Sequence, residues 1–258
     1  MTTDARRLVV PVAVVAAVLL FLLINPWFPL ESGTTVNQIV TVAFWILALA
    51  VVVLMYVDSR DPQTPQVEVE SPRFPRYLFG NTRAGLFWLP IRLFLGFAWL
   101  DAGWHKIQDG WLTDPSSLLS YWERAVAIPE EGRPPITYDW YRSFIQMLID
   151  NGAESWMSWV IPIGEVAVGV GLLVGALTGF AAFFGALMNM NFMLAGSAST
   201  NPVLFFLAVG LMLAWKVAGY YGLDRWLLPA LGVPWHAKLE VAAASDVQPP
   251  PEAGPPTG

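Results

Sequence analysis

The sequence predicts an all-α integral membrane protein with six transmembrane helices, in which a two-helix N-terminal hairpin precedes a four-helix bundle. Composition is the first reason: of 258 residues, 55% are hydrophobic and 13% are charged, whereas a soluble domain carries about 25% charged residues. The second reason is that the apolar residues gather in runs close to the ~20 residues that cross about 30 Å of hydrocarbon. These runs are residues 8–24, 39–57, 87–107, 157–177, 180–195 and 202–215.

The first two runs are expected to form the hairpin, within residues 1–57. The start "MTTDARRLVVPVAVVAAVLLFLL" has the basic and then apolar character of a signal peptide. No A-x-A-like cleavage site follows it, and the second run begins soon afterwards, at Ile39. We therefore expect an uncleaved first helix that pairs with the second.

Composition also divides the rest of the chain. Residues 58–85 are rich in proline and charge and are expected to form a cytoplasmic linker. Residues 86–232 hold the last four runs and are expected to form the four-helix membrane domain. The Pro-rich residues 233–258 are expected to be disordered.

Residues 108–155 interrupt the four-helix domain and are expected to form two short amphipathic helices. Asp114 and Pro115 suit the start of the first helix, because Asp caps a helix N-terminus and Pro fits its first turn. Asn151 and Gly152 suit the end of the second helix. Apolar residues recur at helical spacing between these points, at Leu118, Trp122, Ala125, Tyr138, Tyr141, Ile145 and Leu148.

The distribution of Lys and Arg predicts the orientation, because cytoplasmic loops carry an excess of these residues. They precede the first run, separate the second from the third and follow the sixth, at Arg6, Arg7, Arg60, Arg73, Arg76, Arg83, Arg225 and Lys238. With six spans all these positions share one side, so both termini are expected in the cytoplasm. Residues 108–155, with eight acidic residues and three arginines, then lie outside.

The third run carries four polar side chains that lipid disfavours. Arg92 and Lys106 share one helical stripe, whose members are spaced by four and three residues. That stripe consists of Arg92, Gly96, Trp99, Gly103 and Lys106. Asp101 lies on the opposite face and precedes His105 by four residues.

Polar residues in the other runs extend this pattern into two layers. A charge at the bilayer centre costs at least ~2.5–3.5 kcal/mol on insertion scales, so these residues need partners or a role. The outer layer contains Asp101, Glu165, Asn189 and Asn191, with His105 and Lys106 above them, and the inner layer contains Arg92 and Lys216. We expect close helix contact along a ladder of small residues in the fourth span, at Gly171, Gly175 and Gly179.

Structural alternatives exist for most of these residues. Lys106 lies at a helix end, from which its ammonium can reach the headgroups without any further role. Asp101 and His105 can form a local pair on the helix surface. For Arg92 and Lys216 the alternative is a purely structural charge. For the two asparagines it is a hydrogen bond between helices. Glu165 is the hardest to explain in this way, because its side chain is too short to leave the membrane core.

Several kinds of redox centre are not expected in this chain. It has no cysteine, which excludes disulfides, thiolate chemistry and iron–sulfur clusters. Its two histidines, His105 and His236, are too few for a conventional bis-His haem pair in the membrane, and His105 has no partner for a metal site. It also lacks a G-x-G-x-x-G dinucleotide fingerprint. We expect no metal, haem or flavin, and no nucleic-acid partner.

Three segments together resemble the DoxX/DoxD family, most closely the DoxD-type subunit of thiosulfate:quinone oxidoreductase. They are "RLFLGFAWLDAGWHKIQDGWL", "PIGEVAVGVGLLVGALTGFAAFFGALMNMNFMLAG" and "NPVLFFLAVGLMLAWKVAGYYGLDRWL", within about residues 86–232. The resemblance implies a four-helix subunit of a prokaryotic plasma membrane that passes electrons from a sulfur compound such as thiosulfate to quinone. It also implies a small partner subunit. The two N-terminal spans depart from the family pattern.

The residues suggest roles in such a reaction. Glu165 is expected to relay protons, with Asp101 and His105 nearer the outer surface. Lys106 or Arg92 is expected to stabilise the quinone oxygen. The remaining residues expected at the quinone slot are Trp99, Gly103, Asn189 and Asn191. The outer acids repel an anionic donor, so a local focus of positive charge is expected at Lys106, Arg124, Arg133 or Arg142.

The competing class is a non-catalytic membrane scaffold or accessory subunit of a larger redox complex. In that class the polar layers hold helices together, and the amphipathic helices, linker and hairpin bind partners. A solute transporter is less favoured, because no inverted repeat or pair of broken helices is evident. In every case we expect contact with membrane lipid and a partner subunit or a second copy of the chain.

Overall fold

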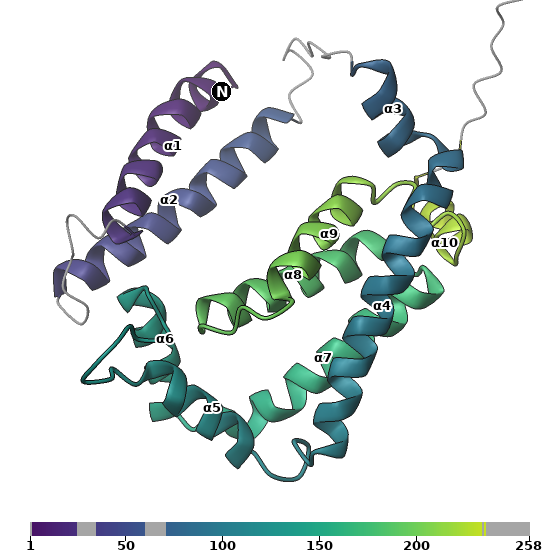
Figure 1. Cartoon of the computed structure of the whole chain (residues 1–258). Coiled ribbons are helices and arrows are strands. Elements are labelled where there is room, and N and C mark those ends of the chain that lie inside the picture. Colours follow the sequence, from purple (N-terminus) through teal and green to yellow (C-terminus); the bar gives the residue numbers. More distant parts are fainter. Residues whose placement is uncertain (1, 25–34, 60–70, 234, 236–258) are drawn as a thin grey trace, which may run out of the picture.

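The computed structural model describes residues 2–24, 35–59, 71–233 and 235, and every regular element in that part is a helix (Figure 1). In chain order these elements are α1 (Thr2–Ile24), α2 (Thr35–Ser59), α3 (Arg73–Gly80), η1 (Thr82–Ala84), α4 (Gly85–Gln108), α5 (Ser116–Val126), α6 (Asp139–Asp150), α7 (Glu154–Val174), α8 (Thr178–Leu194), α9 (Asn201–Leu213) and α10 (Asp224–Ala230). The predicted all-α membrane class is confirmed. Most of the linker and the tail, with Arg60, His236 and Lys238, lie outside the described residues.

The six expected apolar spans all form helices, but their lengths differ. Three segments of the described chain are long and apolar enough to cross a membrane: Gln38–Val57, Thr82–Gln108 and Glu154–Val174. Leu8–Leu23, Thr178–Leu194 and Asn201–Leu213 are shorter apolar helices. The expected sixth span, residues 202–215, corresponds to α9, whose 13 residues reach about 20 Å. Beyond it the chain turns back towards α4.

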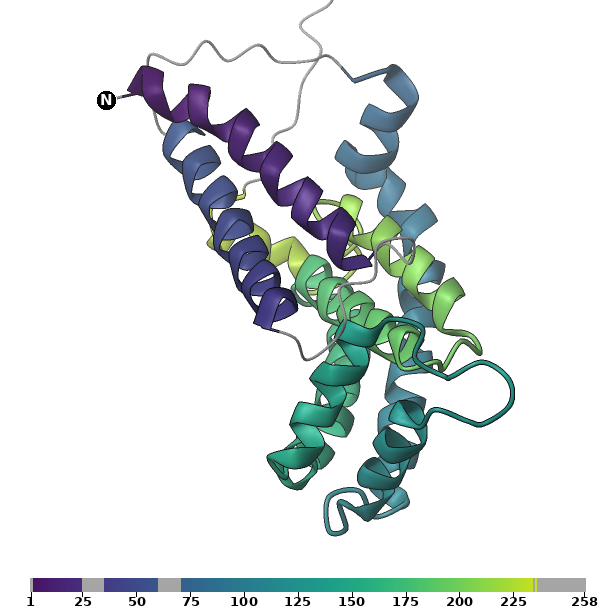
Figure 2. The same cartoon turned by 90° about the vertical axis from the view of Figure 1, so that its left-hand side faces the viewer.

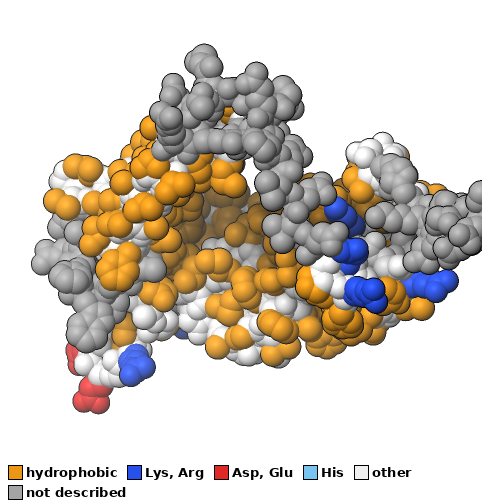
Figure 3. Space-filling model, turned by 90° about the horizontal axis from the view of Figure 1, so that it is seen from above, with side chains coloured by type: hydrophobic (Ala, Val, Ile, Leu, Met, Phe, Trp, Pro, Cys, Tyr) orange, Lys and Arg blue, Asp and Glu red, His pale blue; other side chains and the backbone are white. Residues whose placement is uncertain are grey.

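The first two helices, α1 and α2, pack against each other and lie side by side in two views (Figures 1 and 2). Their apolar side chains remain largely exposed, including Ile46, Leu49 and Val52 of α2. Seen from above, apolar side chains cover most of the described part of the visible face, and Lys and Arg side chains gather on the side where α3 lies (Figure 3). This surface suits lipid, since apolar side chains are stable there.

The two amphipathic helices expected in residues 108–155 are α5 and α6. The carboxylate of Asp114 accepts a hydrogen bond from the backbone N–H of Ser116 at 2.9 Å, which fixes the start of α5. The chain leaves α6 through Gly152, at a φ of +63°. The two helices bury their apolar faces in a core of their own, which includes Leu118, Trp122, Ile136, Tyr141 and Ile145.

The main bundle is built on a long contact between α4 and α7. Glycines allow it: a Cβ on Gly169 would lie 2.6 Å from the backbone nitrogen of Leu100, and one on Gly103 would lie 2.8 Å from the carbonyl oxygen of Pro162. The expected ladder of Gly171, Gly175 and Gly179 on one helix is wrong. Gly175 adopts a left-handed φ of +67° and ends α7, so Gly179 belongs to α8.

The two ends of the bundle are held by different contacts. At the "α10 end", the turn after α7 contacts the segment that follows α9, where the N–H of Leu223 donates to the carbonyl of Val174 at 3.0 Å. At the "α6 end", the Tyr141 hydroxyl donates to the carbonyl of Asn191 at 3.0 Å. The helix α4 runs between these ends, so polar residues at its two extremities serve different sites.

Candidate functional site

The most buried ion pair of the described chain joins α4 to α7 at the α6 end. The Lys106 ammonium donates to both oxygens of Glu165, each at 2.8 Å. The Glu165 side chain is 1% exposed and that of Lys106 is 22% exposed. The close packing at Gly103, one turn before Lys106, brings the two helices near enough for this contact. The structure therefore combines the two residues that the sequence favoured most.

Two aromatic rings also lie near the Lys106 ammonium. The nitrogen is 5.6 Å from the ring centroid of Trp111 and 5.7 Å from that of Phe192, within the ~6 Å range of a cation–π contact. Both rings line a cavity of about 210 Å³, which we call the aromatic cavity. Its wall also includes Tyr121, Trp122, Tyr141, Phe144, Met188 and Asn191. One ammonium thus contacts a buried carboxylate and the edge of an apolar, aromatic space.

Trp99 and Asn189 face the interior between α4 and α8. The indole nitrogen of Trp99 lies close to Gly185, where a Cβ would be 2.9 Å away. Asn189 follows Gly185 by one helical turn and is fully buried. Neither the Trp99 indole nor the Asn189 amide has a hydrogen-bond partner among the described residues, which is uncommon for buried polar groups.

Asn191 lies on a different side of α8 from Asn189, because two residues turn a helix by about 200°. Its side-chain oxygen accepts from the Tyr141 hydroxyl at 3.1 Å, and its amide nitrogen donates to the carbonyl of Leu187 at 2.8 Å. Asn191 thus links α8 to α6 through hydrogen bonds, and it also lines the aromatic cavity. The sequence placed both asparagines in one layer, but the structure does not bring them together.

Asp101 and His105 form a pair on the outer surface of α4, away from Glu165. The His105 Nδ1 atom is 2.8 Å from the carbonyl oxygen of Asp101 and 3.3 Å from its carboxylate. Their side chains are 74% and 62% exposed. This arrangement matches the local surface pair that the sequence left open as an alternative.

Arg92 lies at the α10 end and is 2% exposed. Its guanidinium donates to the carbonyl of Tyr221 at 3.0 Å, and it packs against Gly175 and Gly222. Fourteen residues separate Arg92 from Lys106, which corresponds to about 21 Å along a helix. The two cations therefore cannot contact the same quinone ring, although the sequence analysis expected both at the quinone slot.

Asp224 completes the α10 end, and its role was not predicted. This buried carboxylate accepts from the backbone N–H groups of Leu177 at 2.6 Å and of Thr178 at 2.9 Å. It thereby caps the start of α8, although it is distant in sequence. The sequence motif Gly-Leu-Asp gave no signal for this contact, because capping across elements depends on the tertiary turn.

Asp224 also lines a larger apolar cavity of about 590 Å³ on the outside of α8 and α10. The other lining side chains are mostly apolar, such as Phe180, Phe183 and Trp215. Both carboxylate oxygens of Asp224 are already occupied by backbone donors, and no cation lines this cavity. The cavity suits acyl chains better than an oxygen that becomes negatively charged.

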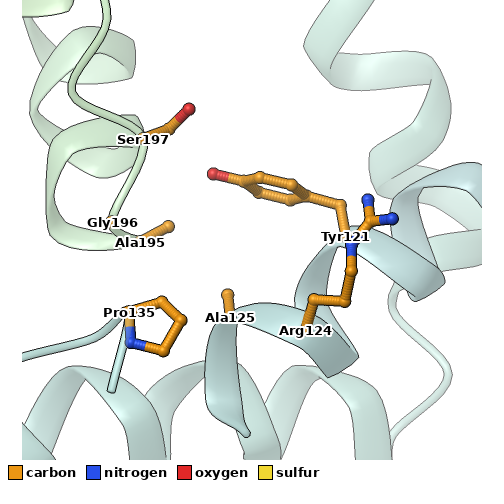
Figure 4. Close-up of a pocket in the computed structure, with 7 residues that line it drawn as sticks. All are labelled: Tyr121, Arg124, Ala125, Pro135, Ala195, Gly196 and Ser197. Atoms are coloured by element: carbon orange, nitrogen blue, oxygen red, sulfur yellow. The ribbon is translucent and has the colours of Figure 1, made fainter. Parts of the chain in front are cut away.

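A second pocket at the α6 end contains polar residues that the sequence did not single out (Figure 4). This "outer pocket" has a volume of about 280 Å³ and is lined by Tyr121, Arg124, Ala125, Pro135, Ala195, Gly196 and Ser197. Burial raises the pKa of the Tyr121 hydroxyl, and the contact with Ser197 and the charge of Arg124 oppose this rise. Only Arg124 was expected here, as a focus of positive charge.

The outer arginines differ in their partners. Arg142 pairs with Asp139 and donates to the carbonyl of Ile136 at 2.6 Å, and Arg133 is exposed on the loop between α5 and α6. Among the described residues, no group of three or more His, Asp or Glu side chains is placed to hold a metal ion.

Comparison with known proteins supports the family resemblance. Residues 87–197 match the family model described as DoxX. The matched segment runs from Phe87 in α4 past the end of α8, and it includes Lys106, Glu165 and the aromatic cavity. No curated protein and no solved structure matches the chain. The match is to the DoxX model over this segment, and it does not identify the DoxD-type thiosulfate subunit.

Proposed function

We propose that this DoxX-type membrane protein is a redox subunit that passes electrons from a sulfur compound such as thiosulfate to membrane quinone, and that the quinone ring binds beside Lys106. One observation carries the proposal: the Lys106 ammonium holds a buried carboxylate and also contacts two rings of the aromatic cavity. A positive charge at the edge of an apolar space suits an oxygen that gains negative charge on reduction.

The reaction sets requirements that these residues can meet. Oxidation of two thiosulfate anions to one tetrathionate, with a new S–S bond, releases two electrons. Reduction of one quinone to quinol takes up two electrons and two protons. The Lys106 ammonium would donate a hydrogen bond to a quinone oxygen, and Glu165 would keep Lys106 in place and carry protons. The apolar wall of the aromatic cavity would exclude water around this oxygen.

The cavity sets the size of the ring that fits. Its volume of about 210 Å³ is below the ~300–1,000 Å³ of pockets for drug-sized ligands. It therefore suits one small ring, with a hydrophobic tail that leaves between the helices into lipid. Asn191 and the hydroxyls of Tyr121 and Tyr141 are further polar groups on its wall. At the larger cavity of the α10 end, Lys216 contacts one lining ring, that of Trp215, but the lining carboxylate of Asp224 is already bound by two backbone N–H groups, so this cavity is the weaker candidate.

The structure changes the roles expected for three other residues. Arg92 serves the α10 end, where it joins α4 to the segment after α9. Asp101 and His105 face outward and do not contact Glu165. We therefore propose Lys106 and Glu165 as the reacting pair, in a prokaryotic plasma membrane with both termini cytoplasmic and the α6 end outside. Redox centres, where the reaction requires them, belong to a partner subunit.

The test is thiosulfate-dependent quinone reduction by the purified protein with its partners, together with the quinone retained on purification. Lys106→Met should lower turnover by roughly 10²-fold or more, the loss typical of removing one donor to a developing negative charge. Lys216→Met is the matched control, because Lys216 is also a single lysine beside a tryptophan, 5.5 Å from the Trp215 centroid, but lies after α9. Full activity of Lys106→Met would contradict the proposal.

The non-catalytic scaffold remains the second candidate, and one observation favours it. Both oxygens of Glu165 are satisfied within the chain, so the pair is also complete as a structural bond between α4 and α7. A scaffold would assemble with its partners and reduce no quinone in the wild-type form. Glu165→Gln would then change assembly or thermal stability, with no turnover to lose.

A further inference from the structure

We infer that the outer pocket is a binding site for a small oxyanion, which under the proposed function is the sulfur-containing electron donor. This inference rests on the proposed function for the identity of the anion. The site lies at the α6 end, between α5 and the loop that joins α8 to α9 (Figure 4). It concerns binding alone and adds no chemical step.

The side chains that line the outer pocket suit an anion. All three polar ones can donate hydrogen bonds: the hydroxyls of Tyr121 and Ser197 and the guanidinium of Arg124. No carboxylate lines the pocket, and the other lining residues are small or apolar. Figure 4 shows the two hydroxyls pointing towards each other across the pocket, with Arg124 beside Tyr121. Donors without a competing acceptor are the arrangement that an oxyanion needs.

Of the three arginines in the outer segment, Arg124 is the one that lines the outer pocket. Residues 108–155 contain eight acidic residues and three arginines, which gives a net charge of −5. Arg142 is paired with Asp139, but Arg124 makes no ion pair or hydrogen bond within the described part of the chain. A lone cation in an acidic segment provides a local focus for an anion that the segment as a whole repels.

The backbone holds the other side of the pocket in place. Gly196 has a φ of +88° and packs against Pro135, where a Cβ would lie 2.7 Å from the carbonyl oxygen. The turn at Gly196 closes α8 through a hydrogen bond of 2.9 Å from the N–H of Ser197 to the carbonyl of Phe192. Ser197 is therefore positioned by the end of the same helix that carries Phe192.

The location connects this pocket to the quinone site. Tyr121 and Ala195 line both the outer pocket and the aromatic cavity. A single ring and a methyl group thus form the shared wall between the two spaces. An anion in the outer pocket would lie on one side of Tyr121, and the cavity edged by Trp111 and Phe192 would lie on the other.

An oxyanion at a membrane surface has two possible sources, a free solute or a lipid phosphate. The two arms of the test separate them. In the first, the protein is held in a detergent without phosphate, and thiosulfate or sulfate is titrated by calorimetry. In the second, a short-chain phosphatidylglycerol is added as competitor. We expect free thiosulfate to bind and the lipid not to displace it.

Arg124→Gln should weaken thiosulfate binding by roughly tenfold or more, the effect of losing a hydrogen bond to a charged group. Tyr121→Phe and Ser197→Ala should weaken it less. Arg133→Gln is the matched control, because it removes an exposed positive charge from the same outer segment without touching the pocket. Any of four results would overturn the inference. They are equal weakening by Arg133→Gln, unchanged binding by Arg124→Gln, no binding by the wild-type protein, and binding of the lipid alone.

The result can be separated from the proposed function. Lys106→Met lies outside the outer pocket and should bind thiosulfate like the wild-type protein while it loses quinone turnover. If thiosulfate binds through Arg124 but no form of the protein reduces quinone, the outer pocket stands and the proposed function fails. If quinone is reduced and Arg124→Gln binds thiosulfate normally, the pocket fails and the proposed function stands.

Discussion

Lys106 and Glu165 each carry a charge out of water, and their mutual contact offsets that penalty. Removing one partner of a buried pair typically costs about 3–5 kcal/mol, because the other charge remains buried, whereas replacing both by apolar groups is often nearly neutral. We therefore predict that Lys106→Met and Glu165→Leu each lower the unfolding temperature. The double variant Lys106→Met/Glu165→Leu should recover most of this loss. Thermal unfolding in detergent measures all four forms.

The double variant also separates structure from function. If it folds like the wild-type protein but neither retains nor reduces quinone, the pair contributes chemistry beyond its structural bond. Full recovery of both stability and turnover would show that the pair is dispensable for the reaction. Single variants as stable as the wild-type protein would show that the pair is not a structural bond at all.

At this scale the sequence predicted the identity of the key residues better than their contacts. Glu165 stood out because a short carboxylate in a membrane span has no route to water, and Lys106 stood out on its helical stripe. The same stripe contained Arg92, but a stripe defines a face and not a depth, so it joined two residues that serve opposite ends of the bundle. Tyr121 and Ser197 gave no signal, because only the packing of α5 on the α8–α9 loop brings them together.

At the scale of helices, glycine determines which faces approach. The sequence predicted close packing through Gly171, Gly175 and Gly179, whose spacing alone cannot show where the helix ends. Gly175 ends α7 instead, and the close contact with α4 depends on Gly169 and on Gly103. The spacing of residues in the sequence shows which small residues share a helix face. Which residues of the other helix they contact depends on how the two helices cross.

This packing leads to a prediction for Gly169→Ala. A Cβ there would lie 2.6 Å from the nitrogen of Leu100 and 2.9 Å from the carbonyl oxygen of Gly96, and backbone atoms cannot move aside as side chains do. We expect a loss of about 1–3 kcal/mol, typical of overpacking, together with weaker quinone retention because Lys106 and Glu165 move apart. Thermal unfolding and quinone content measure the two effects.

Gly164→Ala is the matched control on the same helix. A Cβ at Gly164 would meet only the sulfur of Met188, at 3.7 Å, and alanine favours a helix over glycine by about 1 kcal/mol. This variant should be as stable as the wild-type protein or more so. A Gly169→Ala protein that behaves like Gly164→Ala would show that α4 and α7 are not held by close backbone contact.

At the scale of the whole molecule, the sequence predicted the helical class and the position of every apolar helix. It did so because bilayer thickness constrains the length and composition of a span. It did not predict that α9 would stop at Leu213, since the hydrophobic run continues to Trp215. After α9 the chain returns to α4, where the carbonyl of Tyr221 accepts a hydrogen bond from Arg92, and such a contact leaves no local pattern in the sequence.

The expected orientation of the protein in its membrane follows from charge and fold together. Ser71 lies before α3 and accepts a hydrogen bond of 2.9 Å from Arg76, in the Arg-rich part of the chain expected in the cytoplasm. Gly132 lies on the exposed loop between α5 and α6, in the acidic segment expected outside. The chain contains no cysteine, so Ser71→Cys and Gly132→Cys each introduce a single thiol.

On intact cells an impermeant thiol reagent should label position 132 and spare position 71, and both should be labelled after the membrane is opened. Labelling of position 71 alone would invert the orientation and place the outer pocket in the cytoplasm, and equal labelling of both on intact cells would exclude a topology in which the two loops lie on opposite sides.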